Sequence, residues 1–268
     1  MVMKIDALFA KLWLQYLEVT PCAKPIQQLL CDEDEIINDH VAFRTYALPD
    51  IRLEDLARHF IALGYRYKDE YQFKLKKLRA RYLLHPDPHV PKVFISELKV
   101  DELSSGAQRI IGQLYQQIPA GFMKDSSALY SGRPWRISYQ DYQMLLSESE
   151  YAAWVAAFGY RANHFTVSVN ALKRFNTLED VNEVLIEHGY QLNRSGGPIK
   201  GSRSEMLEQS ATLAEHVCVD FVEQKELIPS CFYEFALRYP DASGQLYQGF
   251  VEASADKIFD STNMRAAG

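Results

Sequence analysis

The chain has 268 residues, of which 47% are hydrophobic and 24% charged, and it carries a net charge of −6 at pH 7 with a pI of about 5.7. This is ordinary globular composition, sufficient for one large domain or two packed halves. The basic run KLKKLRAR, Lys74 to Arg81, is expected to form a solvated strand pair or loop, so nucleic acid is not an expected partner.

Four cysteines, none in a CxxC motif, are too few for a disulfide framework and suit a reducing cytosol. The segment MVMKIDALFAKLWLQYL has an early aspartate, Asp6, and no small-residue cleavage site, so we expect no secretory signal. No apolar run approaches the ~18 residues that a membrane span needs. These features predict a cytoplasmic protein without membrane contact.

Helices are expected in residues 1–35, with one or two helices between Asp6 and Leu30. The next stretch, NDHVAFRTY from Asn38 to Tyr46, has the β-branched and aromatic residues of a strand and is followed by a Pro-Asp turn signal. Because side chains alternate along a strand, His40 and Arg44 share one face.

An internal repeat begins with the next helix. LEDLARHFIALGY, Leu53 to Tyr65, and LEDVNEVLIEHGY, Leu178 to Tyr190, are identical at six of 13 positions and are offset by 125 residues. Both have the apolar spacing of an amphipathic helix. Gly64 and Gly189 stand where a left-handed residue commonly follows a helix end.

The repeat extends to both sides of these helices. NHFTVSVNA, Asn163 to Ala171, alternates like a strand and places His164 where His40 stands in the first half. After the helices, the strands KVFISELKV and CFYEFALRY each contain a glutamate among apolar residues, Glu97 and Glu234 respectively. The two glutamates are therefore interpreted as equivalent positions of the repeat.

Each half is predicted to form one strand, a helix and three further strands, the first in residues 36–100 and the second in residues 161–262. A helical connection is expected in residues 101–160. Two such βαβββ modules can place curved sheets edge to edge and enclose a cavity. We therefore expect an α+β fold in which residues 1–268 form a single compact unit.

The two halves differ in length between the helix and the last strand. From Tyr65 to Glu97 is 32 residues, whereas from Tyr190 to Glu234 is 44. We expect the dozen extra residues near NRSGGPIKGS, Asn193 to Ser202, because its glycines and proline predict a flexible loop.

The duplication predicts that His40, His164 and Glu234 point into one cavity. Two imidazoles and one carboxylate, with the opposite coordination positions open, form the ligand set of non-haem Fe(II) oxygenases. The open positions could take a 2-oxo acid and dioxygen. The same donors also suit Mn, Co, Ni or Zn, so the residues alone do not fix the metal.

Glu97 and Arg44 have more than one interpretation. Glu97 could be a fourth ligand, a group that orients a histidine, or the salt-bridge partner of an arginine, and we favour the last two. Arg44 lies about 13 Å along the strand from His40. Its guanidinium could bind the far carboxylate of a dicarboxylic substrate, or form a structural salt bridge with Glu97.

Seven segments, taken together and in order, resemble the 2-oxoadipate dioxygenase/decarboxylase family. They extend roughly from Asn38 to Thr262, and their order and completeness make the set specific although each motif is weak alone. The segments are NDHVAFRTY, KVFISEL, NHFTVSVN, GGPIKGS, LEQSATLAEHVCVDF, CFYEFALRY and ASADKIFDST.

The resemblance implies the vicinal-oxygen-chelate, or glyoxalase-like, fold with the duplication described above. It implies Fe(II) as the cofactor, bound by His40, His164 and Glu234, although Zn, Ni or Mn could occupy a purified sample. It implies that Arg44, four residues after the first histidine, is the catalytic residue that binds substrate. The implied reaction converts 2-oxoadipate and dioxygen to 2-hydroxyglutarate and carbon dioxide, a step of lysine catabolism.

Two other functions stay open. One is a redox-neutral lyase, isomerase or hydrolase of the glyoxalase type that uses Zn, Ni or Mn, which oxygen consumption would exclude. The other is a non-catalytic binder of a small ligand, in which His40→Ala would leave ligand affinity intact. Lys200, Gln209 and Lys257 match the family motifs without an assigned role, and Arg133 is a weak candidate for an anion contact.

Overall fold

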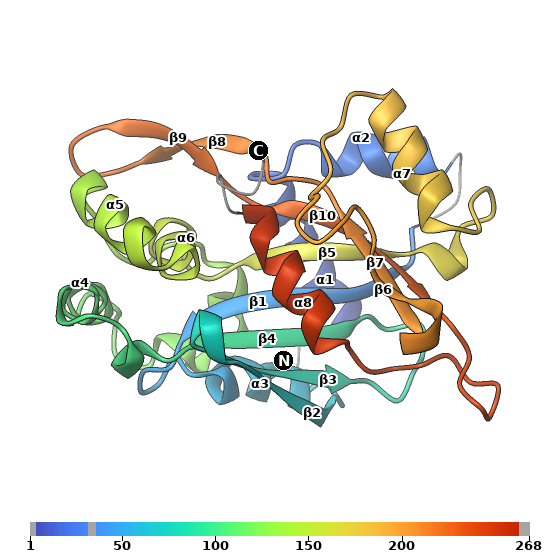
Figure 1. The fold of residues 1–268 in the computed structure, drawn as a ribbon. Coiled ribbons are helices and arrows are strands. Elements are labelled where there is room, and N and C mark those ends of the chain that lie inside the picture. The colour runs from blue at the N-terminus through green and yellow to red at the C-terminus, as the bar shows by residue number, and fades with distance from the viewer. Residues whose placement is uncertain (1–3, 32–35, 263–268) are drawn as a thin grey trace.

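The strands predicted from side-chain alternation join into one curved sheet. Across residues 4–31 and 36–262, which this computed structural model describes, the sheet has eight strands in the order β2-β3-β4-β1-β5-β10-β7-β6 (Figure 1). Its strands are β1 (Asn38–Tyr46), β2 (Arg66–Phe73), β3 (Leu78–Leu84), β4 (Lys92–Leu98), β5 (Ala162–Ser168), β6 (Lys200–Ser202), β7 (Leu207–Ala211) and β10 (Phe232–Arg238). A two-stranded hairpin contains β8 (His216–Asp220) and β9 (Lys225–Pro229).

The two halves of the repeat meet at the centre of the sheet. β1 pairs antiparallel with β5, so Ala42 lies opposite His164. On its other side β1 pairs in parallel with β4, and β5 pairs in parallel with β10. The predicted α+β fold, with two modules joined edge to edge, is confirmed.

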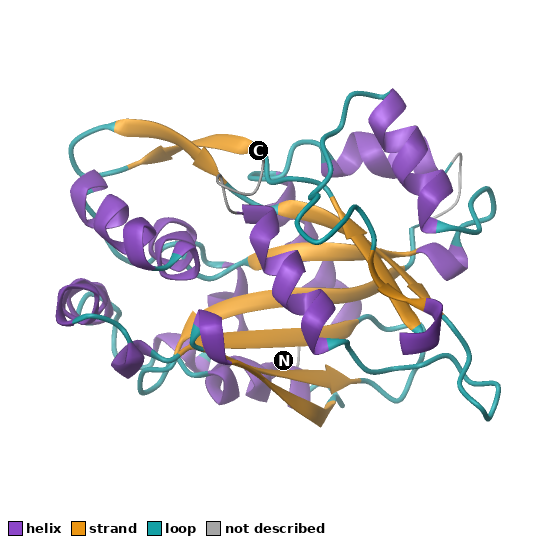
Figure 2. Ribbon diagram, viewed as in Figure 1, coloured by secondary structure: helices purple, strands orange, loops and turns teal. Residues whose placement is uncertain are grey.

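Helices cover both faces of the sheet (Figure 2). On one face α1 contacts β5 and α3 contacts β3 and β4, whereas on the other face α8 contacts β2, β6 and β7. Because α8 reaches strands at both ends of the curved sheet, it covers the face on which His40 and His164 lie. The helices are α1 (Ile5–Leu17), α2 (Ala23–Leu30), α3 (Leu53–Ile61), α4 (Ser105–Tyr115), α5 (Tyr139–Glu148), α6 (Glu150–Phe158), α7 (Leu178–Glu187) and α8 (Glu252–Ile258).

The helices of the repeat begin and end as their sequences predict. At the start of α7 the Thr177 hydroxyl accepts a hydrogen bond from the backbone N–H of Asp180, which satisfies a donor that the helix itself cannot. Gly64 and Gly189 follow the two helices with φ of 103° and 84°, in the left-handed region that favours glycine. The predicted helical connection in residues 101–160 contains α4, α5 and α6.

The predicted position of the dozen extra residues is wrong for most of them. In both halves a short 3₁₀ turn between the second and third strands ends in a left-handed residue, Lys77 in the first half and Met206 in the second. From Tyr65 to Lys77 is 12 residues and from Tyr190 to Met206 is 16, so four extra residues precede this turn. The remaining extra residues follow it, because β8 and β9 pair with each other as an inserted hairpin.

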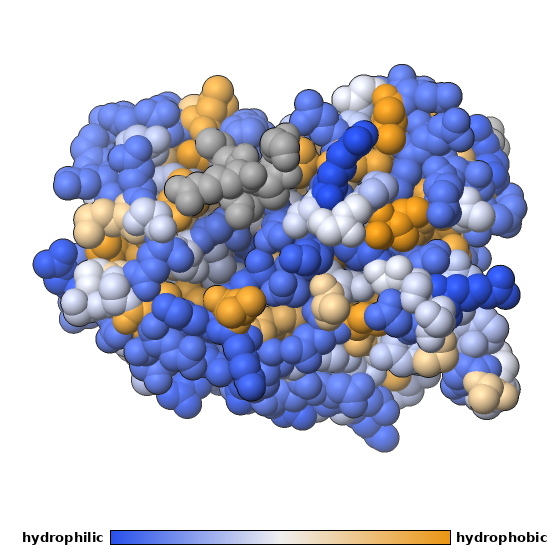
Figure 3. All heavy atoms as spheres, in the orientation of Figure 1, coloured by the Kyte–Doolittle hydropathy of each residue, from blue (hydrophilic) through white to orange (hydrophobic). Residues whose placement is uncertain are grey.

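Polar side chains predominate on the face shown in Figure 3, where apolar side chains form small scattered groups. The apolar residues of the sheet are instead buried, as Phe43, Phe165 and Phe235 are at 1% exposure or less. None of the described helices combines the length and apolar character that crossing a bilayer requires.

The turn between α6 and β5 requires glycine at position 159. Gly159 has φ of 66°, and a Cβ there would lie 2.3 Å from the carbonyl oxygen of Gly132. We expect Gly159→Ala to lower the free energy of unfolding by at least about 2 kcal/mol, because strain and a backbone clash combine. Chemical denaturation followed by circular dichroism measures this change.

Gly112→Ala is the matched control. Gly112 lies inside α4 with no atom within 4 Å of the added Cβ, so this variant should gain about 0.5–1 kcal/mol from helix propensity. Equal stability changes in the two variants would contradict the assignment of strain to position 159.

Candidate metal centre

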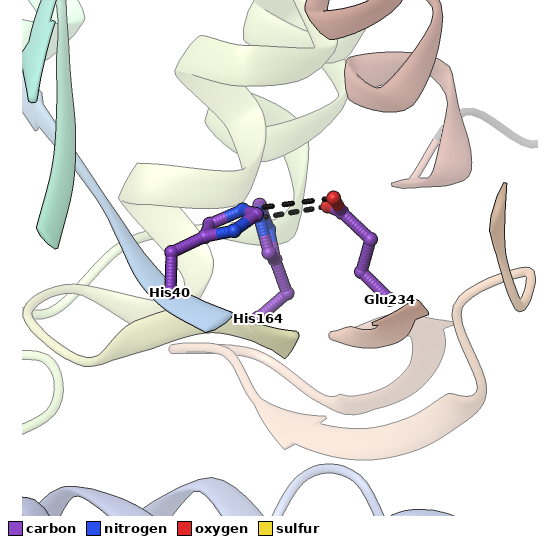
Figure 4. A group of neighbouring side chains, drawn as sticks. All are labelled: His40, His164 and Glu234. Atoms are coloured by element: carbon purple, nitrogen blue, oxygen red, sulfur yellow. Dashed lines mark ion pairs between the residues drawn. The ribbon is translucent and has the colours of Figure 1, made fainter. Parts of the chain in front are cut away.

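Two histidines face each other where the modules join. His40 on β1 and His164 on β5 are both buried, and their ring centroids are 5.6 Å apart (Figure 4). The antiparallel register places Thr166 opposite His40 and Ala42 opposite His164. Residues directly opposite each other in a sheet share a face, so both imidazoles project to the side that α8 covers.

The third group of the centre comes from β10. Glu234 is fully buried, and its carboxylate points at both imidazoles (Figure 4). Oε1 lies 3.6 Å from His40 Nε2, and Oε2 lies 3.1 Å from His164 Nε2. One potential ligand atom from each residue lies within 4.8 Å of the others. The structure therefore brings together the three residues that the repeat predicts.

Oxygen atoms next to each imidazole fix its orientation. His40 Nδ1 lies 2.8 Å from Asp39 Oδ1, and His164 Nδ1 lies 2.9 Å from Asn163 Oδ1. A proton on each Nδ1 satisfies these oxygens and leaves each Nε2 with a lone pair, as in metal-binding histidines. In the absence of a metal, the Thr166 hydroxyl lies 3.1 Å from His40 Nε2 and can donate to it. The sequence analysis missed Asp39 and Asn163, although an oxygen-bearing residue precedes the histidine in both halves of the repeat.

The Asp39 carboxylate is held in place by two cations. Arg238 donates from Nε to Oδ2 at 2.6 Å and from Nη2 to Oδ1 at 2.9 Å, and Lys92 Nζ lies 3.6 Å from Oδ2. Burial alone raises the pKa of the Asp39 carboxyl, but Arg238 and Lys92 outweigh burial and hold this pKa well below its usual value. His40 therefore has an ionised oxygen partner at its Nδ1.

The pKa shifts of His164 and Glu234 favour the forms that bind metals. Burial lowers the pKa of His164 below its ordinary value, despite the opposing effect of Glu234. Burial raises the pKa of the Glu234 carboxyl, but His40, His164 and the Gln209 amide outweigh burial, and the net pKa is lowered. A neutral imidazole and an ionised carboxylate are the forms in which these groups bind metals.

The donor set of this centre fits a divalent transition metal. Two nitrogens and a carboxylate suit Fe(II), Zn, Mn or Ni. Gln209 Nε2 donates to Glu234 Oε1 at 2.6 Å, whereas Glu234 Oε2 is buried and accepts no hydrogen bond within the described residues. An orphaned buried carboxylate oxygen is costly, and a metal ion would satisfy it.

The centre opens into a narrow pocket with aromatic walls. Its free space is about 20 Å³, enough for about one water molecule. The Phe250 ring lies 4.9 Å from the His40 ring, at 89° to it, and Phe259 lines the pocket further along. These side chains shield the centre from bulk water.

Arg44 lines the same pocket, and its salt bridge is not with Glu97. Its Nη1 lies 3.0 Å from Glu150 Oε1, and its Nη2 donates to Thr262 Oγ1 at 3.1 Å. The expected structural salt bridge therefore exists with a different partner, one that comes from α6. The sequence analysis did not identify Glu150 as a member of the site.

Glu97 lies on the opposite face of β4, which corrects its alignment with Glu234. Lys92 lies opposite His40, whereas Phe232 lies opposite His164, so Phe94 is the register equivalent of Glu234. Glu97 instead accepts a hydrogen bond from Leu53 N at the start of α3 and lies 2.8 Å from Arg79 Nε. Glu97 is therefore the salt-bridge partner of an arginine and is too far from the centre to be a ligand.

The remaining motif residues separate into two groups. Gln209 reaches the centre, where it bonds Glu234. Lys200 is buried nearby and donates from Nζ to the Asn193 carbonyl, and burial lowers the pKa of Lys200 to about 8. Lys257 is exposed on α8, and Arg133 contacts the Asp220 carbonyl in the hairpin region, so neither reaches the pocket.

Asp39→Asn tests how His40 is held. We expect metal affinity to fall about 10–100-fold, as is typical when the partner of a ligating histidine is altered. Isothermal titration of the metal-free protein with Co(II) measures this change. An unchanged affinity in a folded variant would show that Asp39 does not support the ligand.

The stability lost in Asp39→Asn should depend on pH. The lowered pKa of Asp39 means that its ion pairs contribute stability above the ordinary aspartate pKa, and that this contribution is lost as pH falls through the lower folded value. The difference in unfolding free energy between the native chain and Asp39→Asn should be constant from about pH 5 to 7 and shrink below about pH 4. A difference that grows on acidification would contradict this sign.

Comparisons with known proteins identify the family of this chain. A family model described as 2-oxoadipate dioxygenase/decarboxylase matches residues 15–130 and 127–241. The chain is 35% identical over 275 residues to the chloroplastic 2-oxoadipate dioxygenase/decarboxylase of Arabidopsis thaliana, covering 92% of this chain and 74% of that protein.

Two solved structures share the whole fold. A Shewanella frigidimarina protein described as a hydrolase is 52% identical, with a TM-score of 0.90 over 93% of this chain and 98% of that one. The Oryza sativa hydroxyglutarate synthase, solved in complex with 2-oxoadipate, is 33% identical, with a TM-score of 0.91 over 97% of this chain and 92% of that one. The chain therefore belongs to the 2-oxoadipate dioxygenase/decarboxylase family and has its vicinal-oxygen-chelate type of fold.

Proposed function

We propose that this protein is an Fe(II)-dependent dioxygenase/decarboxylase that converts 2-oxoadipate and dioxygen to 2-hydroxyglutarate and carbon dioxide. The observation that carries the proposal is the buried cluster of His40, His164 and Glu234 in a member of this family. In the overall reaction the substrate loses its 1-carboxylate as carbon dioxide. One oxygen atom of dioxygen enters the new carboxylate and the other becomes the hydroxyl, so the reaction needs no further reductant.

In this proposal His40, His164 and Glu234 hold the metal, and bound Fe(II) supplies the redox chemistry. The protein keeps the three ligands in their binding forms through Asp39, Asn163 and Gln209. Zn, Ni or Mn bound to the same donors in a purified sample would occupy the centre without supplying that chemistry.

Arg44 is proposed to bind the carboxylate at the far end of the substrate. It lies on the same strand as His40 and lines the same pocket, which supports a substrate that extends from the metal along β1. A guanidinium binds a carboxylate through two parallel hydrogen bonds, so it can fix both the position and the direction of the acid. The aromatic wall keeps water from weakening that contact.

We propose that residues 1–268 act as one unit, with modules in 36–100 and 161–262, N-terminal helices in 1–35 and a connection in 101–160. A cytoplasmic location and a place in lysine catabolism follow from the cysteine content and from the substrate proposed here. The expected partners are the 2-oxo acid and dioxygen, with neither nucleic acid nor membrane.

A redox-neutral glyoxalase-type reaction is the second candidate. It is favoured by the description of the Shewanella relative as a hydrolase and by a donor set that also suits Zn. The two candidates differ in one observable, because only the dioxygenase consumes oxygen in proportion to the 2-oxo acid.

Oxygen uptake tests the proposal. The purified protein is loaded anaerobically with Fe(II) and mixed with 2-oxoadipate, and air is then admitted while dissolved oxygen and carbon dioxide are followed. We expect one oxygen consumed for each carbon dioxide released, and a loss of at least about 10³-fold in His164→Ala, since removing a ligand removes the metal chemistry.

His188→Ala is the control for this experiment. His188 is exposed at the end of α7 and bonds only its own helix among the described hydrogen bonds, so uptake should be unchanged. Carbon dioxide release without oxygen loss, or no reaction with any 2-oxo acid in a metal-loaded sample, would move the redox-neutral reaction ahead.

A further inference from the structure

Arg44 already has a carboxylate partner within the chain. Its Nη1 lies 3.0 Å from Glu150 Oε1, and the two side chains are 1% and 19% exposed. Such a pair, with little water around it, is held more strongly than a surface salt bridge. The positive charge of Arg44 is therefore already paired with Glu150 before a substrate carboxylate binds.

The surroundings of Arg44 are largely aromatic. The rings of Tyr151, Trp154 and Phe259 lie 5.0–5.6 Å from its guanidinium carbon. Its Nε is buried and makes no hydrogen bond within the described residues. The guanidinium thus has one unused N–H donor, and a second carboxylate placed next to Glu150 would be repelled by it.

Glu150 has a place to which it can move. It stands in the first turn of α6 and lines a second cavity of about 190 Å³, on the far side of Phe259 from the metal pocket. Lys76 and Lys77 also line this cavity. Each lysine already has an acidic partner in the chain, Asp260 for Lys76 at 2.7 Å and Glu148 for Lys77 at 3.5 Å. A change of side-chain rotamer would place the Glu150 carboxylate in this cavity, beside these ion pairs and near the helix N-terminus, where a negative charge is favoured.

We propose that Glu150 is a specificity-determining residue, a built-in carboxylate that holds Arg44 until the far carboxylate of a dicarboxylic substrate displaces it. This inference rests on the function proposed above. In it, Glu150 makes the affinity for a 2-oxo acid depend on the charge at the far end of that acid. A 2-oxo acid with an apolar end would leave the Arg44–Glu150 pair intact. A dicarboxylic acid would have to separate the pair, which lowers its apparent affinity.

Removing the charge of Glu150 should therefore act in opposite directions on two matched acids. 2-Oxoadipate and 2-oxohexanoate have the same chain length and differ by a carboxylate or a methyl group at the far end. In Glu150→Gln, which keeps an oxygen to accept from Arg44, 2-oxoadipate should bind at least about tenfold more tightly. 2-Oxohexanoate should bind equally or more weakly, because it leaves the cation without a charged partner.

The experiment measures binding without turnover. Co(II)-loaded protein is titrated with each acid under anaerobic conditions, and the visible absorption of the metal reports chelation. Glu183→Gln is the matched control, since Glu183 is exposed on α7 and lines neither this cavity nor the metal pocket. The control should leave the ratio of the two dissociation constants within about twofold of the native value, because an exposed charge acts weakly at a distance.

The results distinguish a role of Glu150 in substrate specificity from a role in supporting Arg44. If the native protein responds to both acids and Glu150→Gln leaves their ratio unchanged, or weakens 2-oxoadipate, Glu150 only supports Arg44 and the inference is overturned. If the native protein responds to neither acid, the proposed function falls, and this inference with it. Should Glu150→Gln lose the fold by circular dichroism, Glu150→Asp, whose carboxylate is one methylene further from Arg44, must show the same change in ratio to a smaller extent.

Discussion

Burial of the Glu234 carboxylate is the constraint on which the centre of the molecule depends. An ionised carboxylate inside a protein is costly unless it is paired or bound to a metal. Burial lowers the pKa of His164 and so favours its neutral form, and the net pKa of Glu234 is lowered, which favours the ionised carboxylate. The two modules thus bring a negative charge and imidazole lone pairs to one point, and a cation is what this point needs for electrical balance.

A single guanidinium links the metal ligands to the wall of the pocket. Arg238 binds Asp39, which orients His40, and it also donates from Nη1 to the carbonyls of Tyr247 and Gly249 at 2.9 and 2.7 Å. The next residue in the chain, Phe250, packs against the His40 ring. The position of the wall and the orientation of a ligand are therefore fixed by the same side chain, which joins the structure of β10 to the chemistry proposed for the centre.

The sequence was sufficient to predict the features that both halves of the repeat share. It was insufficient for features that depend on strand register or on contacts between distant residues. His40 and His164 could be found because both strands alternate and both precede a similar helix. Glu97 was aligned with Glu234 as its equivalent in the repeat, because a sequence shows the composition of a strand but not its register. A shift of three residues moves a side chain to the other face of the strand. The contact between Arg44 and Glu150 joins residues 106 positions apart and has no local signal.

Metal binding tests the central claim most directly. The metal-free protein would be titrated anaerobically with Fe(II) by isothermal calorimetry, beside Glu234→Gln and the surface variant Glu226→Gln. The account predicts one tightly bound ion per chain in the native protein and in Glu226→Gln, with affinity lost in Glu234→Gln while the fold is kept. Tight binding that survives in Glu234→Gln, or no binding to the native chain, would contradict the assignment of the centre.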